Sequence, residues 1–432
     1  MSETFQPVTN ESEPTIALLP WGDRFEDFFD TIGVSFETFR EEITGSWQFG
    51  YIDALRVAGV RTVLFYVSAR VAAPLRFTHK PSGATVCVLP APVIHRAVRA
   101  IHRKFIAGQL KSLESLASYL ATPLGLLARE LRREGCAAIL CQEYEYARFD
   151  ACVLLGQLMG LPIFATFQGG DQQMSHLEQP LRLRAMQGCA GLIIPTQTEV
   201  QRVQACYGIP STKLARIFNP MDVTAWRAMD RTEARAALGI PLDSQVVVYH
   251  GRIEISRKGL DILMDAWKQV CADRPGRDLR LLLVGTGSDA DKLRDLIATM
   301  QLQGILWVDE FVHDRTAIQR FLSAADVYTL PSRHEGFPVA PIEAMACGLP
   351  VVAADAPGVP DIFEGGEASG GIVVPRGDAT ALALALGRVL DNEAWGRELG
   401  KRARCRAEEC FSLEVIGKQL HDFLLKPHMH TK

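Results

Sequence analysis

The sequence lacks the patterns that characterise several large classes of protein. Only 10 of its 432 residues are cysteines, and no two of them form a C-x-x-C pair, which argues against a disulfide framework or a zinc cage. Neither sign of charge dominates, because 46 basic residues face 50 acidic ones, so no overall positive field would attract nucleic acid. No apolar run reaches the ~20 uninterrupted residues that cross a bilayer, and the polar start MSETFQPVTNESEP is not typical of a signal peptide. We therefore expect a cytoplasmic, globular protein without a nucleic-acid partner.

Short apolar runs rich in Val, Ile and Leu alternate with helical patterns along the chain. The runs are continuous rather than alternating in polarity, as expected for parallel strands covered by helices on both faces. The predicted strands are 16–19, 62–67, 85–89, 138–141, 163–166, 191–195, 245–250, 279–285, 305–308, 327–330 and 351–354. Strand–helix alternation on this scale predicts an α/β, doubly wound architecture.

A boundary between two such domains is predicted in the segment 219–243. The segment starts with Asn-Pro and breaks at Gly239-Ile240-Pro241 before a strand. We expect one domain over residues 1–220 and a second over 221–411. The last helical stretch, 412–425, is amphipathic, and its pattern alone leaves open which domain it covers.

Arg252 and Lys258 follow a predicted strand and lie beside the start of a helix. In open parallel sheets, ligands bind at the carboxyl ends of the strands. The planar fork of an arginine and the mobile charge of a lysine suit a diphosphate at such a place. Taken alone, the segment fits two surface residues equally well.

Gly285 and Gly287 belong to a second motif, a G-x-G-x-x-A turn between a strand and a helix. The turn is close to the dinucleotide fingerprint, which leaves a nicotinamide or flavin dehydrogenase open as a reading of this motif. Phe311 and Val312 follow the next strand, where backbone groups can read the edge of a base. A phenylalanine at such a position is more commonly part of the core.

Glu335 and Glu343 are separated by seven residues. The first lies in a Gly/Pro loop after the strand 327–330, and the second lies in the first turn of the next helix, with Pro341 near its first position. Each carboxylate can accept hydrogen bonds from two hydroxyls, so the pair suits a nucleotide sugar with two vicinal diols. An isolated pair would fit a solvated loop and a helix-dipole glutamate, but its place downstream of Arg252 and Lys258 favours a ligand.

Together these segments resemble the GT-B glycosyltransferases, in particular the large family 4 of retaining enzymes. The resemblance covers about residues 191–423. It rests on NPMD (219–222), GR…RKG, VGTGSD, PSRHEGFPVAPIEAMACGLPVV and GGIVVPRGD (370–378). It implies two Rossmann-like domains facing a cleft, with the final stretch 412–432 crossing back onto the N-terminal domain. It also implies transfer of a hexose from a nucleoside diphosphate sugar to an acceptor hydroxyl, with the anomeric configuration retained.

The resemblance assigns a role to each motif. Arg252 and Lys258 would hold the donor diphosphate, Glu335 the transferred sugar and Glu343 the ribose. The other donor-binding positions that it implies are Gly251, Gly285, Gly287, Phe311, Val312, Gly336, Phe337 and Pro338, with Gly45 and Ser46 in a first Gly-rich loop. On the acceptor side it implies Gln168, where family members often carry histidine, with Gly169 and Asp171. No metal or other cofactor is required, because the two cations supply the charge.

Two segments of the N-terminal half stand apart from this pattern. An added stretch, WGDRFEDFFDTIGVSFETFREEI (21–43), precedes the first Gly-rich loop. The segment 92–111 is predicted to form a basic amphipathic helix, which can lie on an anionic membrane. Its apolar face would carry Ile94, Ala97, Val98, Ile101 and Phe105, and its basic side Arg96, Arg99, His102, Arg103 and Lys104. An ordinary surface helix, or a site for an acidic acceptor, fits the same pattern.

Other functions fit parts of the same pattern. A nucleotide-sugar epimerase would share the fold and the donor site without needing an acceptor. A non-catalytic protein would bind the donor without turnover. A dehydrogenase would rest on residues 285–290 alone and would leave the two cations and the two glutamates unexplained.

Overall fold

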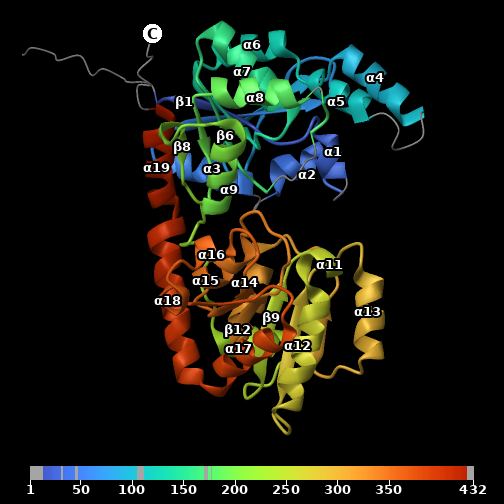
Figure 1. Cartoon of the computed structure of the whole chain (residues 1–432), viewed down its shortest axis with the longest axis vertical. Helices are drawn as coiled ribbons and strands as arrows, with labels where there is room; N and C mark the ends of the chain where they lie inside the picture. The colour runs from blue at the N-terminus through green and yellow to red at the C-terminus, as the bar shows by residue number, and fades with distance from the viewer. Residues whose placement is uncertain are drawn as a thin grey trace, which may run out of the picture.

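The computed structural model describes residues 13–30, 33–43, 47–104, 111–169, 174–176 and 178–425. Two lobes, each built around its own sheet, follow one another along the long axis of the molecule (Figure 1). This is the α/β architecture with two Rossmann-like parallel sheets that the sequence predicts.

The sheet of the N-terminal lobe has the order β3-β4-β2-β1-β5-β6-β7-β8. Its strands are β1 (Thr15–Leu19), β2 (Arg61–Ser68), β3 (Leu75–Thr78), β4 (Thr85–Pro90), β5 (Cys136–Gln142), β6 (Ile163–Thr166), β7 (Gly191–Ile193) and β8 (Leu214–Ala215). The pairing is parallel except between β3 and β4. The carboxyl ends of β1, β5 and β6 therefore meet at one edge of the sheet.

The sheet of the C-terminal lobe has the order β11-β10-β9-β12-β13-β14 and is parallel throughout. Its strands are β9 (Gln245–His250), β10 (Leu279–Val284), β11 (Ile305–Val308), β12 (Val327–Leu330), β13 (Val351–Ala354) and β14 (Gly371–Val374). Because β9 and β12 are neighbours, the loops that follow them lie side by side.

Every predicted strand is present, and the apolar runs are largely buried as continuous strands should be, except in the edge strand β11, whose four residues are only partly buried. The sequence analysis missed β3, β8 and β14. The strand β3 is a half-exposed antiparallel edge strand, and β8 has only two residues. Such strands lack the continuous apolar run that identifies the buried ones.

Helices cover both faces of each sheet. In the N-terminal lobe they are α1 (Glu26–Phe29), α2 (Phe36–Glu41), α3 (Trp47–Val57), α4 (Val93–Lys104), α5 (Lys111–Tyr119), α6 (Leu124–Arg133), α7 (Ala147–Met159), α8 (Glu178–Gly188) and α9 (Gln197–Tyr207). In the C-terminal lobe they are α10 (Arg231–Leu238), α11 (Ile255–Lys258), α12 (Leu260–Ala272), α13 (Ala290–Thr299), α14 (Arg315–Ala324), α15 (Ala340–Ala346), α16 (Val359–Ile362), α17 (Ala379–Asp391) and α18 (Glu393–Phe411). Several begin where an aspartate or threonine side chain accepts the hydrogen bond of a first-turn amide, as Asp314 does at α14.

The last helix, α19 (Leu413–Leu425), continues from α18 along one side of the molecule to the N-terminal lobe (Figure 1). It packs on α3, and a Cβ at Gly417 would lie 2.2 Å from the carbonyl oxygen of Ala54. The chain passes between the lobes twice, near Met221 and near Ser412, and these two segments lie side by side. The N–H of Met221 donates to the carbonyl oxygen of Phe411 at 2.7 Å, and Met221 forms an isolated parallel β-bridge with Ser412. The domain limits at residues 220 and 411 stay a prediction.

The ten cysteines are all free thiols, as the sequence analysis expects. Within the described ranges, no helix is both long and apolar enough to cross a membrane.

Candidate functional site

The loops at the carboxyl edge of the C-terminal sheet pack backbone against backbone. A Cβ at Gly285 would lie 2.0 Å from the carbonyl oxygen of Gly251, and one at Gly287 would lie 2.4 Å from that of Ile253. Gly259 meets the carbonyl oxygen of Pro331 in the same way, at 2.1 Å. Only glycine fits at these contacts. Backbone packing therefore explains the two glycines of the G-x-G turn, and the motif by itself does not identify the ligand.

Lys258 and Glu335 form an ion pair in this edge. The Lys258 Nζ lies 2.8 Å and 3.0 Å from the two carboxylate oxygens of Glu335, and both side chains are largely buried. The hydroxyl of Ser332 donates to the same carboxylate at 2.6 Å. These bonds fix the Glu335 carboxylate and leave part of its hydrogen-bonding capacity free, because a carboxylate has about four lone-pair sites.

Glu343 meets the last residue of β9. Its carboxylate lies 2.7 Å from Nε2 of His250, whose ring packs edge-on against Tyr328. Glu343 lies in the first turn of α15, with Pro341 in that turn, as the sequence predicts. Glu335 thus lies in the loop after β12 and Glu343 in the helix that follows this loop. Their partners are Lys258, in the short helix after β9, and His250, at the end of β9.

The side chain of Arg252 does not join Lys258 and Glu335. Its side chain is 70% exposed and its guanidinium donates to Glu254 at 3.1 Å. Lys258 and Glu335 are therefore in contact, whereas Arg252 projects from the neighbouring loop.

The predicted aromatic positions differ in environment. Phe311 is 60% exposed, so the common reading of such a residue as part of the core is wrong here, whereas Val312 packs on the core of the lobe. Phe337 is buried and stacks on Phe218, with ring centroids 5.3 Å apart. Pro338 beside it is buried as well. At Phe337 and Pro338 the side chains therefore serve packing, and only the backbone remains for a ligand.

On the acceptor side, Gln168 and Gly169 lie in the loop after β6. The Gln168 amide exchanges hydrogen bonds of 3.4 Å with Asn219, which also accepts from the hydroxyl of Tyr51 at 3.1 Å. Gly169 touches the other lobe, because a Cβ on it would lie 2.7 Å from Cα of Gly336. Three other predicted positions, Gly45, Ser46 and Asp171, lie outside the described residues.

Glu143 shapes this acceptor-side loop. It has a positive φ of 96°, which is unusual for a residue with a side chain. Its carboxylate accepts from the backbone N–H groups of Gln168 at 3.0 Å and of Glu145 at 3.2 Å. The residue thus ties the loop after β5 to the loop after β6. The sequence analysis missed it, since nothing in the local pattern marks a strained glutamate.

A cavity of about 610 Å³ lies between the lobes beside Glu335 and Gly336. The N-terminal lobe contributes Glu145, Phe167, Gly169, Thr196, Thr198, Glu199 and Arg202, and the C-terminal lobe adds Ser256, Arg257, Arg333, His334 and Pro357. Glu343 lines a second, smaller cavity of about 110 Å³ together with Asn219. The two glutamates therefore do not open into one cavity of this structure.

A charged cluster on the N-terminal wall of the larger cavity was missed by the sequence analysis. Arg202 donates to Glu199 at 2.6 Å and to Glu145 at 2.8 Å. The hydrogen bond to Glu199 raises the pKa of Arg202, and burial raises the pKa of Glu145. Glu145, which closely follows a predicted strand, was the local signal that could have revealed it.

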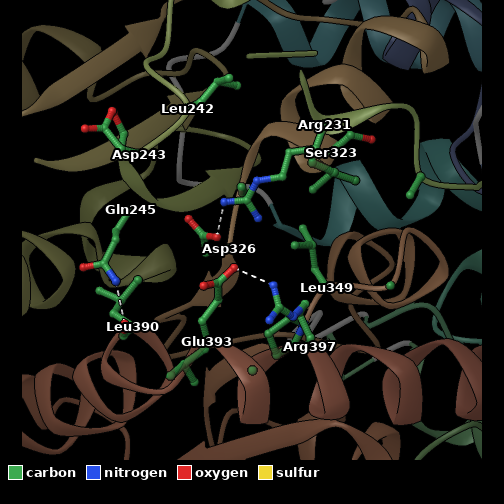
Figure 2. Close-up of a pocket in the computed structure, with 18 of the residues that line it drawn as sticks. Arg231, Leu242, Asp243, Gln245, Ser323, Asp326, Leu349, Leu390, Glu393 and Arg397 are labelled. Atoms are coloured by element: carbon green, nitrogen blue, oxygen red, sulfur yellow. Dashed lines mark hydrogen bonds and ion pairs between the residues drawn. The ribbon is translucent and has the colours of Figure 1, made fainter. Parts of the chain in front are cut away.

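A third cavity, of about 570 Å³, lies at the opposite edge of the C-terminal sheet, where β9 and β12 begin. Figure 2 shows that its charges face one another: Arg231 pairs with Asp326 at 2.5 Å and Arg397 with Glu393 at 2.6 Å. None of the described residues that line it belongs to the predicted site. Across the described part of the chain, no group of three or more His, Cys, Asp or Glu residues is placed to hold a metal ion.

Comparison with known proteins gives both a family match and a fold. Residues 244–392 match the model of the family "Glycosyl transferases group 1". The D-inositol 3-phosphate glycosyltransferase of Kineococcus radiotolerans is 30% identical over 231 residues, which is 50% of this chain and 53% of that protein. The aligned part thus spans about half the length of the first curated relatives.

Two solved structures resemble the whole chain. Sucrose-phosphate synthase from Thermosynechococcus elongatus has a TM-score of 0.69 at 22% identity, over 95% of this chain and 98% of that one. Anabaena HepE in complex with UDP has a TM-score of 0.68 at 18% identity, over 95% and 99%. Likeness at such identities shows the shared fold. With two facing parallel-sheet lobes and these whole-chain likenesses, the chain has the GT-B fold, and residues 244–392 of its second lobe are similar to the group 1 glycosyl transferases.

Proposed function

We propose that the chain transfers a hexosyl group from a nucleoside diphosphate sugar to an acceptor hydroxyl, with retention of the anomeric configuration. The observation that carries this proposal is the Lys258–Glu335 pair, which lies beside a cavity between the lobes. The similarity of residues 244–392 to group 1 glycosyl transferases supports it. So do the curated relatives that act on D-inositol 3-phosphate and the related fold crystallised with UDP.

The proposed chemistry places cationic groups where charge develops. As the bond between the anomeric carbon and the diphosphate breaks, negative charge grows on the bridging oxygen and the sugar becomes oxocarbenium-like. Lys258 stabilises that oxygen, and preorganised donors of this kind are worth ~3–4 kcal/mol each. Because Lys258 and Arg252 supply positive charge at the diphosphate, the proposed mechanism does not call for a metal ion.

Arg252 joins Lys258 when the donor binds. Its present partner is Glu254 in an exposed pair, and such pairs contribute only ~0–1 kcal/mol. Exchange of this partner for a diphosphate therefore costs little, and the guanidinium fork matches two phosphate oxygens. The acceptor hydroxyl attacks on the face from which the diphosphate departs, and its proton passes to the leaving phosphate oxygen.

Glu335 holds the hydroxyls of the transferred sugar, while Glu343 holds the ribose. Lys258 and Ser332 already fix the Glu335 carboxylate, so the side chain needs little reorganisation on binding. Glu343 exchanges part of its contact with His250 for the diol. Gly336 and the turn at Gly285 and Gly287 offer backbone groups around the donor.

We also propose that α4 contacts an anionic membrane surface. Val93 and Ile94 are 72% and 57% exposed and Ile101 is half-exposed on the same helix, with Arg96 exposed beside them. Exposed aliphatic side chains on a basic helix are typical of interfacial binding. The structure corrects one detail: Arg99 is not on a free basic side, because it pairs with Asp27 at 2.8 Å. Phe105 lies outside the described residues.

Vesicle sedimentation tests the membrane contact. The protein should bind vesicles that contain phosphatidylglycerol more strongly than vesicles of phosphatidylcholine alone, because the helix is basic. Ile94→Glu should lower this binding, whereas Leu158→Glu, at an exposed site of α7, should not. Equal binding by both variants would contradict the contact.

The activity is tested by turnover with a panel of nucleotide sugars, after donors are identified by thermal shift. Glu335→Gln keeps the shape of the side chain but replaces one acceptor oxygen and the negative charge with a donating NH2 group. It should lower kcat by at least about tenfold, or ~1.4 kcal/mol. The affinity for the nucleotide alone should change little, because the nucleotide does not reach Glu335. Glu398→Gln, on the exposed side of α18, is the matched control. Transfer by Glu335→Gln at the wild-type rate would overturn the assignment.

A further inference from the structure

The added segment builds a small aromatic recess at the carboxyl edge of the N-terminal sheet. Trp21 follows the end of β1, and Phe28 lies on α1. Their rings meet edge to face with centroids 5.3 Å apart, and the ring of Tyr146, after β5, lies 6.0 Å from Trp21. Trp21 and Phe28 remain 36% and 39% exposed. Two adjoining aromatic rings that stay partly exposed beside a recess offer an apolar surface to a ligand.

Two buried donors line the same recess. Gln48 is only 4% exposed; its Oε1 accepts from the hydroxyl of Tyr66 at 2.8 Å, but its Nε2 has no partner among the described residues. Arg24 also lines the recess, and its buried Nε likewise has no partner among them. A buried donor left unpaired costs ~1–3 kcal/mol. An oxygen atom that enters the recess would offer an acceptor to such donors.

The wall of the recess is held rigidly. The buried guanidinium of Arg148 donates to the carbonyl oxygens of Pro20 and Asp23, at 2.7 Å each. The hydroxyl of Ser118 donates to the Asp23 carboxylate at 2.8 Å. Since both ends of the loop are fixed, the position of Trp21 does not depend on a ligand.

The recess lies close to the proposed transfer centre. The strand β1 is separated from β6 only by β5, and neighbouring strands are about 4.8 Å apart. Trp21 therefore follows a strand roughly 10 Å from the strand that leads to Gln168 and Gly169. The recess itself has a volume of about 20 Å³, which is enough for one hydroxyl or water.

We propose that this recess is a subsite for a carbohydrate or cyclitol ring of the acceptor. The apolar C–H face of such a ring packs on Trp21 and Phe28, and one ring hydroxyl enters the recess and accepts from Gln48 Nε2 and Arg24 Nε. An alkyl chain would use the aromatic wall but leave both donors unpaired, so the ring fits better. The identification of this ligand as the acceptor rests on the proposed function; the ring-binding site itself does not.

Saturation-transfer NMR with the full chain tests the subsite. The probes are methyl glucoside, methyl mannoside, methyl galactoside and myo-inositol, with dodecylphosphocholine as the alkyl probe. At least one ring probe should receive saturation from the wild-type protein. Trp21→Ala and Gln48→Met should each weaken its binding at least fivefold, whereas Leu158→Ala, at an exposed site of α7, should leave it unchanged.

The same variants separate this proposal from the proposed function. Thermal shift by the nucleotide sugar should be equal in wild type and Trp21→Ala, which also shows that the variant is folded. Binding of alkyl probe only, of no ring probe, or of a ring probe equally by Trp21→Ala would overturn the subsite. Ring binding without any nucleotide-sugar binding would leave the subsite standing and overturn the proposed function.

Discussion

At the scale of single residues, the side chains around the cleft are fixed by hydrogen bonds that the protein makes without a ligand. Glu335 is held by Lys258 and Ser332, and Glu343 by His250. Such bonds limit the rotamers of each carboxylate before the donor arrives. Preorganisation of this kind is what makes polar groups effective in catalysis.

His79 is a buried residue of the same region whose protonation should be visible in stability. Its Nε2 donates to the carbonyl oxygen of Ile43 at 3.0 Å, its Nδ1 accepts from Ser82, and its ring stacks on Phe49. The ring is therefore neutral, and burial lowers the pKa of His79 to about 4.

The pH dependence of unfolding tests this assignment. Between pH 6.5 and 4 the unfolded chain binds a proton at His79 that the folded chain does not, so stability is present above pH 6.5 and is lost toward pH 4. The loss should reach up to about 3 kcal/mol in the free energy of unfolding by urea. His79→Gln should flatten the profile in this window, and His421→Gln, at a more exposed histidine, should not. Parallel profiles for wild type and His79→Gln would contradict the buried neutral ring.

At the scale of elements, the attachment of α19 to α3 depends on a glycine. Gly417 lets the two helices approach so closely that a Cβ would lie 2.2 Å from the carbonyl oxygen of Ala54. On the same helix Ile416 and Leu420 are fully buried in the core of the N-terminal lobe. The contact therefore ties the end of the chain to the first lobe.

Gly417→Ala should destabilise the protein, by ~1–3 kcal/mol, because an added methyl group has no room between the helices. The measurement is urea unfolding followed by circular dichroism. Gly125→Ala is the matched control: Gly125 lies in α6, and a Cβ there would have nothing within 4 Å, so alanine should stabilise by up to ~1 kcal/mol. Equal effects of the two substitutions would show that α19 does not require this close approach.

At the scale of the whole molecule, the lobes touch where the transfer is proposed to occur. The loop of Gly169 from one lobe meets the backbone of Gly336 from the other, next to Glu335. The geometry of that contact decides how near the acceptor loop lies to the sugar site. A small change at this point should thus alter activity more than stability.

Gly169→Ala tests this coupling between lobes. The new Cβ would lie 2.7 Å from Gly336 Cα, so the lobes must separate locally and the rate of transfer should fall by at least about tenfold. Gly160→Ala carries a similar backbone strain, since φ is +66° at Gly160 and +95° at Gly169, but a Cβ there would have nothing within 4 Å. Gly160→Ala should lower the free energy of unfolding by ~1–2 kcal/mol and leave the rate of transfer unchanged. Similar rates for the two variants would argue against the contact as a determinant of transfer.

The sequence by itself determined most of the elements and the resemblance to a family. Strands such as β9 and β12 are continuous apolar runs. Such strands can be predicted from a short stretch of sequence, because burial on both faces of the sheet requires an unbroken run of apolar residues. The helix α7 ends at Gly160, whose left-handed conformation closes it, and a glycine at such a position is a signal that is local in the sequence. The motifs around Arg252, Glu335 and Glu343 were sufficient for the resemblance to GT-B enzymes. By contrast, β3 and β8 carry too little buried surface to leave a local signal.

Only the tertiary structure decided which of these residues meet. Lys258 and Glu335 are in contact because β9 and β12 are neighbours in the sheet, and sheet order is a property of packing rather than of local sequence. The same holds for the recess, which joins Trp21 after β1 to Gln48 on α3. It holds equally for the placement of Glu335 and Glu343 in separate cavities. Contacts between residues far apart in the chain depend on how whole elements pack, and no local pattern encodes that.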